Sequence, residues 1–160
     1  MVVAAFFLAG CVFTSLVEYW AHRLMHRHPG LGRAHRRHHR ASAGQGVLRE
    51  LWDYLRYGFV LMLPMFPVSL EAGIGWLGGC LACSLFAAYA HQLQHENPAA
   101  CFWMRAPLHH IHHRDNLWHH NFGLSLDVWD RVFGTYKRVE WKREADPGRP
   151  ARGPLRVRWW

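Results

Sequence analysis

Apolar and polar residues follow one another along this chain in long blocks. Three apolar blocks contain no Lys, Arg, Asp, Glu or His: residues 2–17, 57–70 and 72–90. A membrane-spanning helix needs about 20 mostly apolar residues, and about 17 is the lower limit. The third block meets this length, and the first does so if the residues after it reach the lipid headgroups. The second block is shorter and contains Pro64 and Pro67, which disrupt the interior of a helix.

This pattern predicts an all-α integral membrane protein with about three transmembrane segments, formed by one helix and a hairpin over residues 57–90. We expect the turn of the hairpin at residues 67–73, and a single long span with a re-entrant arm is the alternative. The helix of the third block should continue beyond residue 90 and end at Asn97 and Pro98. Three further helices are expected over residues 2–27, 33–40 and 104–114.

The basic residues lie outside the apolar blocks. Of 19 Lys and Arg residues, eight fall in residues 18–56 and eleven in residues 91–160, and the net charge is +8. The positive-inside rule puts both basic regions on the cytoplasmic side, and a hairpin provides the even number of crossings between them. We therefore predict a bacterial inner-membrane protein with residue 1 outside and the C-terminus inside. Nucleic-acid binding is the usual reading of such a charge, but here the basic residues flank apolar blocks and fit an anionic leaflet.

The composition also predicts two regions in the chain. Residues 1–139 contain all the apolar blocks and form one membrane domain. Residues 140–160 are rich in Arg and Pro and poor in large apolar side chains until the end, which predicts a basic, disordered tail.

The chain contains 14 histidines, and most of them stand at helical spacings in four short repeats. Side chains three and four positions apart share one face of a helix, so each repeat directs two or three imidazoles to one point. The repeats follow the first and third apolar blocks in the same order, so both sets should meet at one membrane face. Ten convergent histidines predict more than one metal ion: His22, His26, His35, His38, His39, His91, His95, His109, His112 and His113.

The other four histidines, His28, His110, His119 and His120, have no such spacing, and we assign none of them as a ligand. The four cysteines predict neither a disulfide framework nor a metal site, because Cys80 and its neighbours lie within apolar blocks where thiols act as small apolar side chains. A haem protein would need facing histidines within the bilayer, and the apolar blocks contain none.

From residue 18 to residue 136 the chain resembles the membrane fatty acid hydroxylase and sterol desaturase superfamily, which includes the carotenoid hydroxylases. The last of the matching motifs are more similar to the sterol and fatty acid branch. The motifs that carry the resemblance are Tyr19-Trp20-Ala21-His22-Arg23-Leu24-Met25-His26, His35-Arg36-Arg37-His38-His39, Gln94-His95-Glu96-Asn97, Leu108-His109-His110-Ile111-His112-His113, Asn121-Phe122-Gly123 and Trp129-Asp130-Arg131-Val132-Phe133-Gly134-Thr135-Tyr136.

The resemblance implies a non-haem di-iron oxygenase that hydroxylates or desaturates a membrane lipid with O2, and it implies the ten histidines as ligands. Asn121 and Asp130 match family positions, where they are expected to orient imidazoles through a ring N–H. Imidazole also suits zinc, so a zinc-dependent transporter or hydrolase is the alternative, but zinc has no redox chemistry for unactivated C–H bonds.

The chain has no dinucleotide-binding glycine motif and no cysteine cluster for an iron–sulfur centre. An electron-transfer partner of the cytochrome b5-like or ferredoxin type is therefore expected. The basic face formed by Arg33, Arg36, Arg37 and Arg40 is a candidate docking surface, with contact to lipid headgroups as the alternative. The sequence does not identify the lipid.

Overall fold

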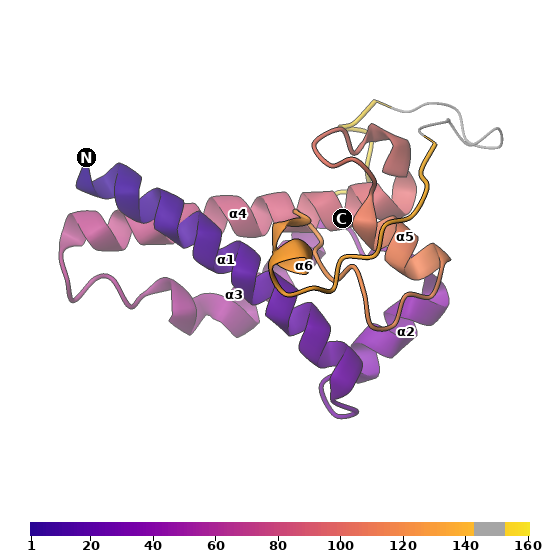
Figure 1. Ribbon diagram of the computed structural model, residues 1–160. Helices are drawn as coiled ribbons and strands as arrows, with labels where there is room; N and C mark the ends of the chain where they lie inside the picture. The colour runs from indigo at the N-terminus through magenta and orange to yellow at the C-terminus, as the bar shows by residue number, and fades with distance from the viewer. Residues whose placement is uncertain (143–152) are drawn as a thin grey trace.

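The computed structural model describes residues 1–142 and 153–160, and all its regular elements in these ranges are helical (Figure 1). The α-helices are α1 (Val2–Arg27), α2 (Arg33–Ala41), α3 (Val47–Gly58), α4 (Leu70–Glu96), α5 (Leu108–Arg114) and α6 (Val128–Val132). Two short 3-10 helices, η1 (Phe59–Met62) and η2 (Pro98–Ala100), follow α3 and α4. The prediction of an all-α fold is confirmed for the described residues.

Helices α1 and α4 are the two longest elements and lie side by side (Figure 1). Each is long and apolar enough to cross a membrane, with 26 and 27 residues respectively. Their close approach depends on small residues: a Cβ on Gly75 would collide with the Val3 carbonyl, and one on Gly79 with the Phe7 carbonyl. This agrees with the way small residues let helices pack closely in lipid.

The span predicted over residues 57–70 is not a continuous helix. Residues 57–70 contain the end of α3, the short helix η1 and a series of turns, and α4 begins at Leu70. The turns start after Met62, earlier than the predicted 67–73, because Pro64 and Pro67 both lie in this segment. The Ser69 hydroxyl then caps α4 by accepting a hydrogen bond from the Ala72 N–H at 3.1 Å. Two helices, rather than three segments, meet the length and composition of a span among the described residues.

The polar elements gather at one end of the α1–α4 pair. Helices α2 and α5 lie beside the C-terminal ends of α1 and α4, and the turns before α4 lie at the opposite end (Figure 1). The predicted helices over 2–27 and 33–40 are confirmed, and α4 ends with Asn97 as its C-cap. Helix α5 begins at Leu108 rather than near residue 104, directly after Pro107.

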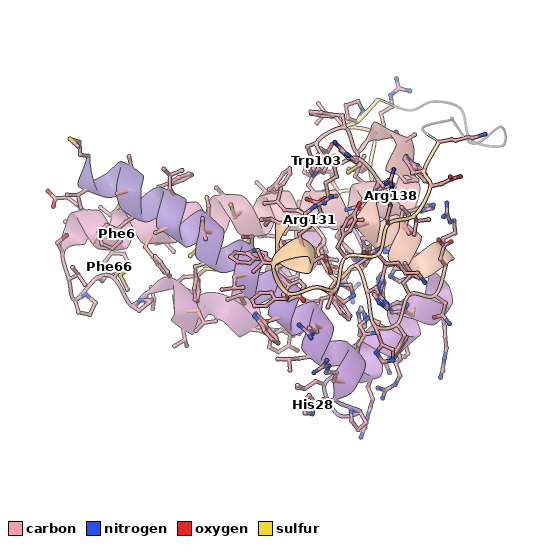
Figure 2. All side chains as sticks on the ribbon, viewed as in Figure 1. Phe6, His28, Phe66, Trp103, Arg131 and Arg138 are labelled. Atoms are coloured by element: carbon pink, nitrogen blue, oxygen red, sulfur yellow. The ribbon has the colours of Figure 1, made fainter. Side chains whose placement is uncertain are left out.

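The main core lies under this polar end. It consists of buried residues from α3, α4, α5 and the segments that follow them: Val47, Ala88, Leu93, Cys101, Met104, Leu108 and Val157. Figure 2 shows the density of side chains at this end, where Trp103 contributes to the packing around the core.

The C-terminal residues 153–160 return to α3. The Val47 N–H donates to the Arg158 carbonyl at 3.0 Å and the Leu48 N–H donates to the Trp159 carbonyl at 2.9 Å, so these carbonyls cap the start of α3. Val157 is buried in the core. Part of the predicted disordered tail, residues 143–152, lies outside the described residues. In the described part, residues 153–160, Val157 is buried and the other residues are exposed.

Candidate metal centre

Five histidines form a first group: His22, His26, His35, His39 and His112. They come from α1, α2 and α5, and their nearest ring nitrogens all lie within 4.8 Å of one another. The Nε2 atom of His26 is central, at 2.8 Å from Nε2 of His35 and 3.0 Å from Nε2 of His112. Three segments far apart in the sequence therefore direct imidazoles to one point.

Four histidines form a second group: His38, His91, His95 and His109. Helix α2 contributes His38, and the C-terminal part of α4 contributes the pair with helical spacing that was predicted. His95 Nε2 lies 3.0 Å from Nε2 of His109 and 3.2 Å from Nε2 of His38. Each triplet therefore contributes to both groups: His35, His39 and His112 lie in the first, and His38 and His109 lie in the second.

His113, the tenth predicted ligand, contacts both groups. Its ring stacks on His39 with centroids 4.0 Å apart and lies 4.8 Å from the ring of His95. Both of its ring nitrogens are buried without a hydrogen-bond partner among the described residues. A buried unpaired nitrogen costs free energy, which is recovered if it binds a cation.

The outer ring nitrogens of several histidines in the two groups lie against backbone carbonyls. Nδ1 of His22 lies 2.6 Å from the Phe122 carbonyl, and Nδ1 of His112 lies 2.7 Å from the His120 carbonyl. In the second group, Nδ1 of His38 lies 3.0 Å from the Ala43 carbonyl. A carbonyl only accepts, so Nδ1 carries the proton and the Nε2 lone pair faces the centre of the group.

These lone pairs fit metal ions. Neighbouring Nε2 atoms of the first group lie 2.8 to 3.3 Å apart. Nitrogen donors on a common ion at about 2.1 Å would be roughly 3.0–3.4 Å apart, depending on coordination number. Facing lone pairs repel at this distance unless a cation lies between them, so each group has the donor set and the spacing of a metal site.

Burial also keeps these imidazoles neutral. Loss of hydration, followed by the nearby histidines, lowers the pKa of His35 from 6.5 to about 2 and that of His39 to about 3. Loss of hydration likewise lowers the pKa of His112 to about 4. Since only the neutral ring coordinates a metal, the first group has the protonation state that metal binding requires at neutral pH.

Asp130 has a different role from the predicted one. Its carboxylate accepts hydrogen bonds from the N–H groups of Phe122 at 2.9 Å and Gly123 at 2.7 Å, and from the Thr135 hydroxyl at 2.7 Å. It therefore fixes the loop whose Phe122 carbonyl binds His22, instead of contacting an imidazole itself.

Asn121 also organises this loop. Its side chain makes two hydrogen bonds to the backbone of Lys137, and its φ of 60° lies in the left-handed region that Asn tolerates better than most residues. The prediction that these two residues orient imidazoles directly is replaced by an effect through the loop backbone.

The four unassigned histidines stay outside both groups. His28 caps the end of α1 and is exposed, at the outer tip of the helix in Figure 2. The ring of His110 contacts Trp141, and His119 is exposed. His120 contributes its backbone carbonyl, a role that no side-chain pattern in the sequence indicates.

Two polar residues near the histidine groups, Gln94 and Glu18, were assigned no role from the sequence, although Gln94 lies within one of the matching motifs. Gln94 is fully buried, accepts a hydrogen bond from the His109 N–H at 2.9 Å and donates to the Leu124 carbonyl at 2.6 Å. The Glu18 carboxylate lies one turn before His22. It accepts hydrogen bonds from the backbone N–H groups of Leu124 and Ser125 and from the Ser125 hydroxyl. For Glu18 the available signal is its position four residues before His22.

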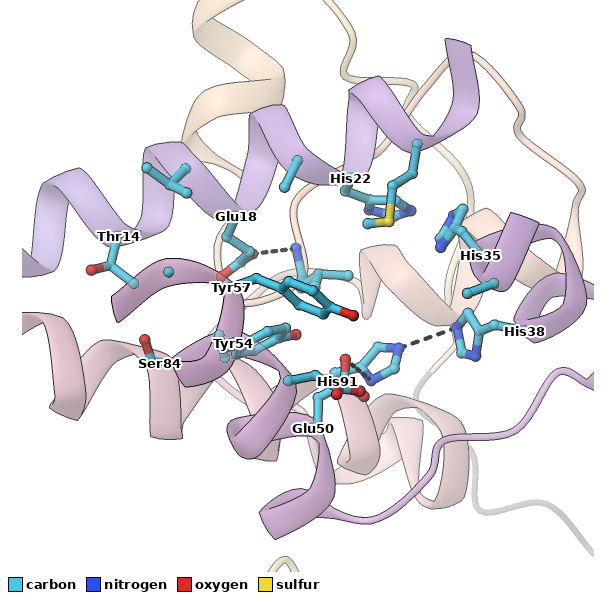
Figure 3. Close-up of a pocket in the computed structure, with 18 of the residues that line it drawn as sticks. Thr14, Glu18, His22, His35, His38, Glu50, Tyr54, Tyr57, Ser84 and His91 are labelled. Carbon is cyan, nitrogen blue, oxygen red and sulfur yellow. Dashed lines mark hydrogen bonds and ion pairs between the residues drawn. The ribbon is translucent and has the colours of Figure 1, made fainter. Parts of the chain in front are cut away.

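A cavity of about 720 Å³ lies between α1, α3 and α4 and leads to the histidines (Figure 3). One part has mainly apolar walls that include Phe13, Val17, Leu61 and Cys80. The other part is lined by histidines of both groups: His22, His35, His38, His91 and His109. This volume is typical of ligand sites, and the apolar lining suits a hydrocarbon chain.

Comparison with known proteins agrees with this chemistry. A sequence profile of the fatty acid hydroxylase family matches residues 7–135. The chain is 26% identical over 133 residues to ornithine lipid hydroxylase OlsE of Rhizobium tropici, covering 79% of this chain and 40% of that protein. It is also 26% identical over 141 residues to the Delta(7)-sterol 5(6)-desaturase of Leptosphaeria maculans, covering 83% of this chain and 36% of that protein.

A third relative is fatty acid hydroxylase vlmA of Lecanicillium sp, which is 26% identical over 142 residues, covering 73% of this chain and 38% of that protein. The chain spans about two fifths of the length of the curated relatives it matches. No solved structure gives a significant match. Two apolar helices and lipid-modifying relatives indicate a membrane protein. Since the profile covers most of the sequence, the chain belongs to the fatty acid hydroxylase family.

Proposed function

We propose that this protein is a membrane di-iron oxygenase that hydroxylates or desaturates a lipid such as a fatty acyl chain or a sterol. The observation that carries the proposal is the meeting of two histidine groups at the end of a largely apolar cavity. A hydrocarbon chain in this cavity would lie between mainly apolar walls and close to histidines of both groups.

Iron ions held by the two groups would supply the redox chemistry that activates dioxygen for attack on a C–H bond. Zinc binds imidazole equally well but has no redox chemistry. The protein's own part is to hold nine or ten neutral imidazoles in fixed orientations and to present a carbon of the substrate to them. Apolar side chains such as Phe13 and Leu61 align the chain by excluding water from its surface.

Each turnover needs two external electrons, which we propose come from an electron-transfer protein of the cytochrome b5-like or ferredoxin type. Its docking surface would be the basic side of α2, where Arg33, Arg37 and Arg40 are exposed. Arg36 on the same helix donates to the Pro29 carbonyl at 2.8 Å, so it stabilises the α1–α2 connection instead. An acidic partner would be steered to this surface by charge.

We further propose that the metal end faces the cytoplasm and residue 1 faces outward, in a bacterial inner membrane. The basic residues that gather around α2, α5 and the C-terminal part support this orientation through the positive-inside rule. Cysteine labelling from outside intact cells tests it. A cysteine introduced at exposed Arg114 should be protected, and one at residue 1 should react, whereas the opposite pattern would reverse the orientation.

The central experiment is lipid mass spectrometry of cells that express the full chain, with and without oxygen. Wild type should yield a lipid that has gained one oxygen atom or lost two hydrogens, only when oxygen is present. His112→Ala should abolish this product, because His112 contacts His26 at the centre of the first group. His119→Ala is the matched control, since His119 is exposed and outside both groups. An unchanged lipid profile with oxygen and reductant present would refute the oxygenase function.

A further inference from the structure

Glu50 is a carboxylate in the wall of the cavity, next to a ligand of the second group (Figure 3). Its Oε1 atom lies 3.3 Å from Nδ1 of His91, and the side chains are 14% and 7% exposed respectively. The contact is electrostatic, because Nδ1 of His91 is buried and makes no hydrogen bond in the described structure. The Nε2 atom on the other side of the same ring lies 3.2 Å from Nε2 of His38. Glu50, His91 and the centre of the second group are therefore in a row.

The local structure holds Glu50 in this position. It lies in the first turn of α3, and its backbone N–H donates to the Gly46 carbonyl at 3.0 Å. Its other carboxylate oxygen accepts a hydrogen bond of 2.9 Å from the Gln45 amide, which also donates to Asp53 at 2.8 Å. The first turn of a helix favours a negative charge, which lowers the cost of burying this carboxylate.

The start of α3 is in turn fastened to α4. The Gly46 N–H donates to the Gln92 side chain at 2.8 Å, one residue after His91 in the sequence. A Cβ on Gly44 would collide with the same Gln92 amide, so the two segments are in close contact. Glu50 and His91 are thus carried by two helices whose relative position is fixed nearby.

The two histidine groups differ in what supports their rings. The outer nitrogens of His22 and His112 in the first group bind neutral backbone carbonyls. In the second group His38 likewise faces a backbone carbonyl, that of Ala43, whereas His91 faces a carboxylate. A carboxylate acceptor on the remote N–H of a ligating histidine fixes the ring and makes it a stronger donor to the metal.

We propose that Glu50 is a positioning residue for the second group: its carboxylate, 3.3 Å from Nδ1 of His91, attracts the N–H side of this ring, keeps Nε2 directed toward His38 and strengthens metal binding at that group relative to the first. This inference rests on the proposed metal centre. A simpler role for Glu50, in which it only joins α3 to α4, predicts a loss of stability with no selective effect on one group.

The experiment is a titration of the purified, metal-free full chain in detergent with Co²⁺, whose visible absorption reports imidazole coordination without any turnover. Wild type should bind two equivalents. Glu50→Leu should weaken one of them by about 10–100-fold and leave the other unchanged. Glu50→Gln keeps an acceptor but not the charge, so its loss should be smaller.

Asp127→Asn is the control, because Asp127 pairs with Arg131 on α6 and contacts neither Glu50 nor an imidazole in the described structure. It should leave both equivalents unchanged. Two outcomes overturn the proposal: unchanged affinity for both equivalents in Glu50→Leu, or equal weakening of both together with a lower melting temperature. If wild type itself fails to bind two equivalents, the proposed metal centre fails, and this result is distinct from either outcome in the variants.

Discussion

Asp130 connects the loop after α5 to the first histidine group, and replacing it by Asn tests that connection. The carboxylate is fully buried and accepts three hydrogen bonds, two of them from backbone N–H groups. An amide retains one acceptor oxygen, so Asp130→Asn leaves at least one buried N–H without a partner. Such an unpaired group costs about 1–3 kcal/mol, and the remaining bonds lose their charge-assisted strength.

A second effect reduces this cost. Burial raises the pKa of Asp130, because the charged carboxylate loses hydration in the folded protein. Keeping this carboxylate charged therefore lowers the stability of the fold. The neutral amide avoids this cost, so we expect a net loss of about 2–3 kcal/mol. For a protein of this size that corresponds to a fall in Tm of roughly 4–12 °C.

The assay is thermal unfolding followed by tryptophan fluorescence in detergent, with metal content measured on the same samples. Asp127→Asn is the control: its pair with Arg131 is exposed, and such pairs contribute little to stability. Metal content should fall together with Tm in Asp130→Asn, because the Phe122 carbonyl that holds His22 belongs to the affected loop. A Tm within about 1 °C of wild type would refute the reasoning. Loss of metal at unchanged Tm would instead indicate that Asp130 orients the imidazoles directly.

Three further predictions concern helix packing, pH and electron transfer. Gly79→Ala should lower Tm, since its Cβ would collide with the Phe7 carbonyl, whereas Gly78→Ala, whose Cβ lies 3.5 Å from the Phe7 ring, should not. The pKa of His112 is about 4 in the folded protein and 6.5 ordinarily, so its contribution to stability is complete above pH 6.5 and is lost as the pH falls toward 4. The Tm of the metal-free protein should therefore decline from pH 7 to pH 5, and a flat profile would contradict the buried neutral state. Charge reversal in Arg40→Glu, which is exposed and outside the cavity lining, should slow reduction by an acidic donor roughly tenfold at low salt with unchanged metal content. Equal reduction rates would show that the donor does not dock on α2.

The helices that carry the ligands could be predicted from the sequence because their signals are local. Helical spacing identifies His91 and His95 as one pair, and Asn97 and Pro98 end the same helix where predicted. The histidine repeats follow the first and third apolar blocks in the same order. This order also predicted that the two sets of histidines meet at one end of the helices. Nine of the ten predicted ligands fall into two groups in the structure, and His113 contacts both.

Features that depend on tertiary contact could not be predicted in this way. Hydropathy alone counts residues 57–70 as an apolar block, although Pro64 and Pro67 limit its helix to one short 3-10 turn after α3. The support for the ligands comes from loop carbonyls, as at Phe122, and from a carboxylate on another helix, Glu50. A carbonyl is present in every residue, so no sequence pattern distinguishes the one that binds an imidazole.

The central claim is that each chain holds two iron ions, and metal analysis of the purified protein tests it most directly. Cells grown with iron should yield a chain with two equivalents of iron by inductively coupled plasma mass spectrometry. His35→Ala and His95→Ala, one from each group, should each reduce this content, while His28→Ala should not. Two equivalents of zinc, with no uptake of iron when the metal-free protein is reconstituted, would contradict the account.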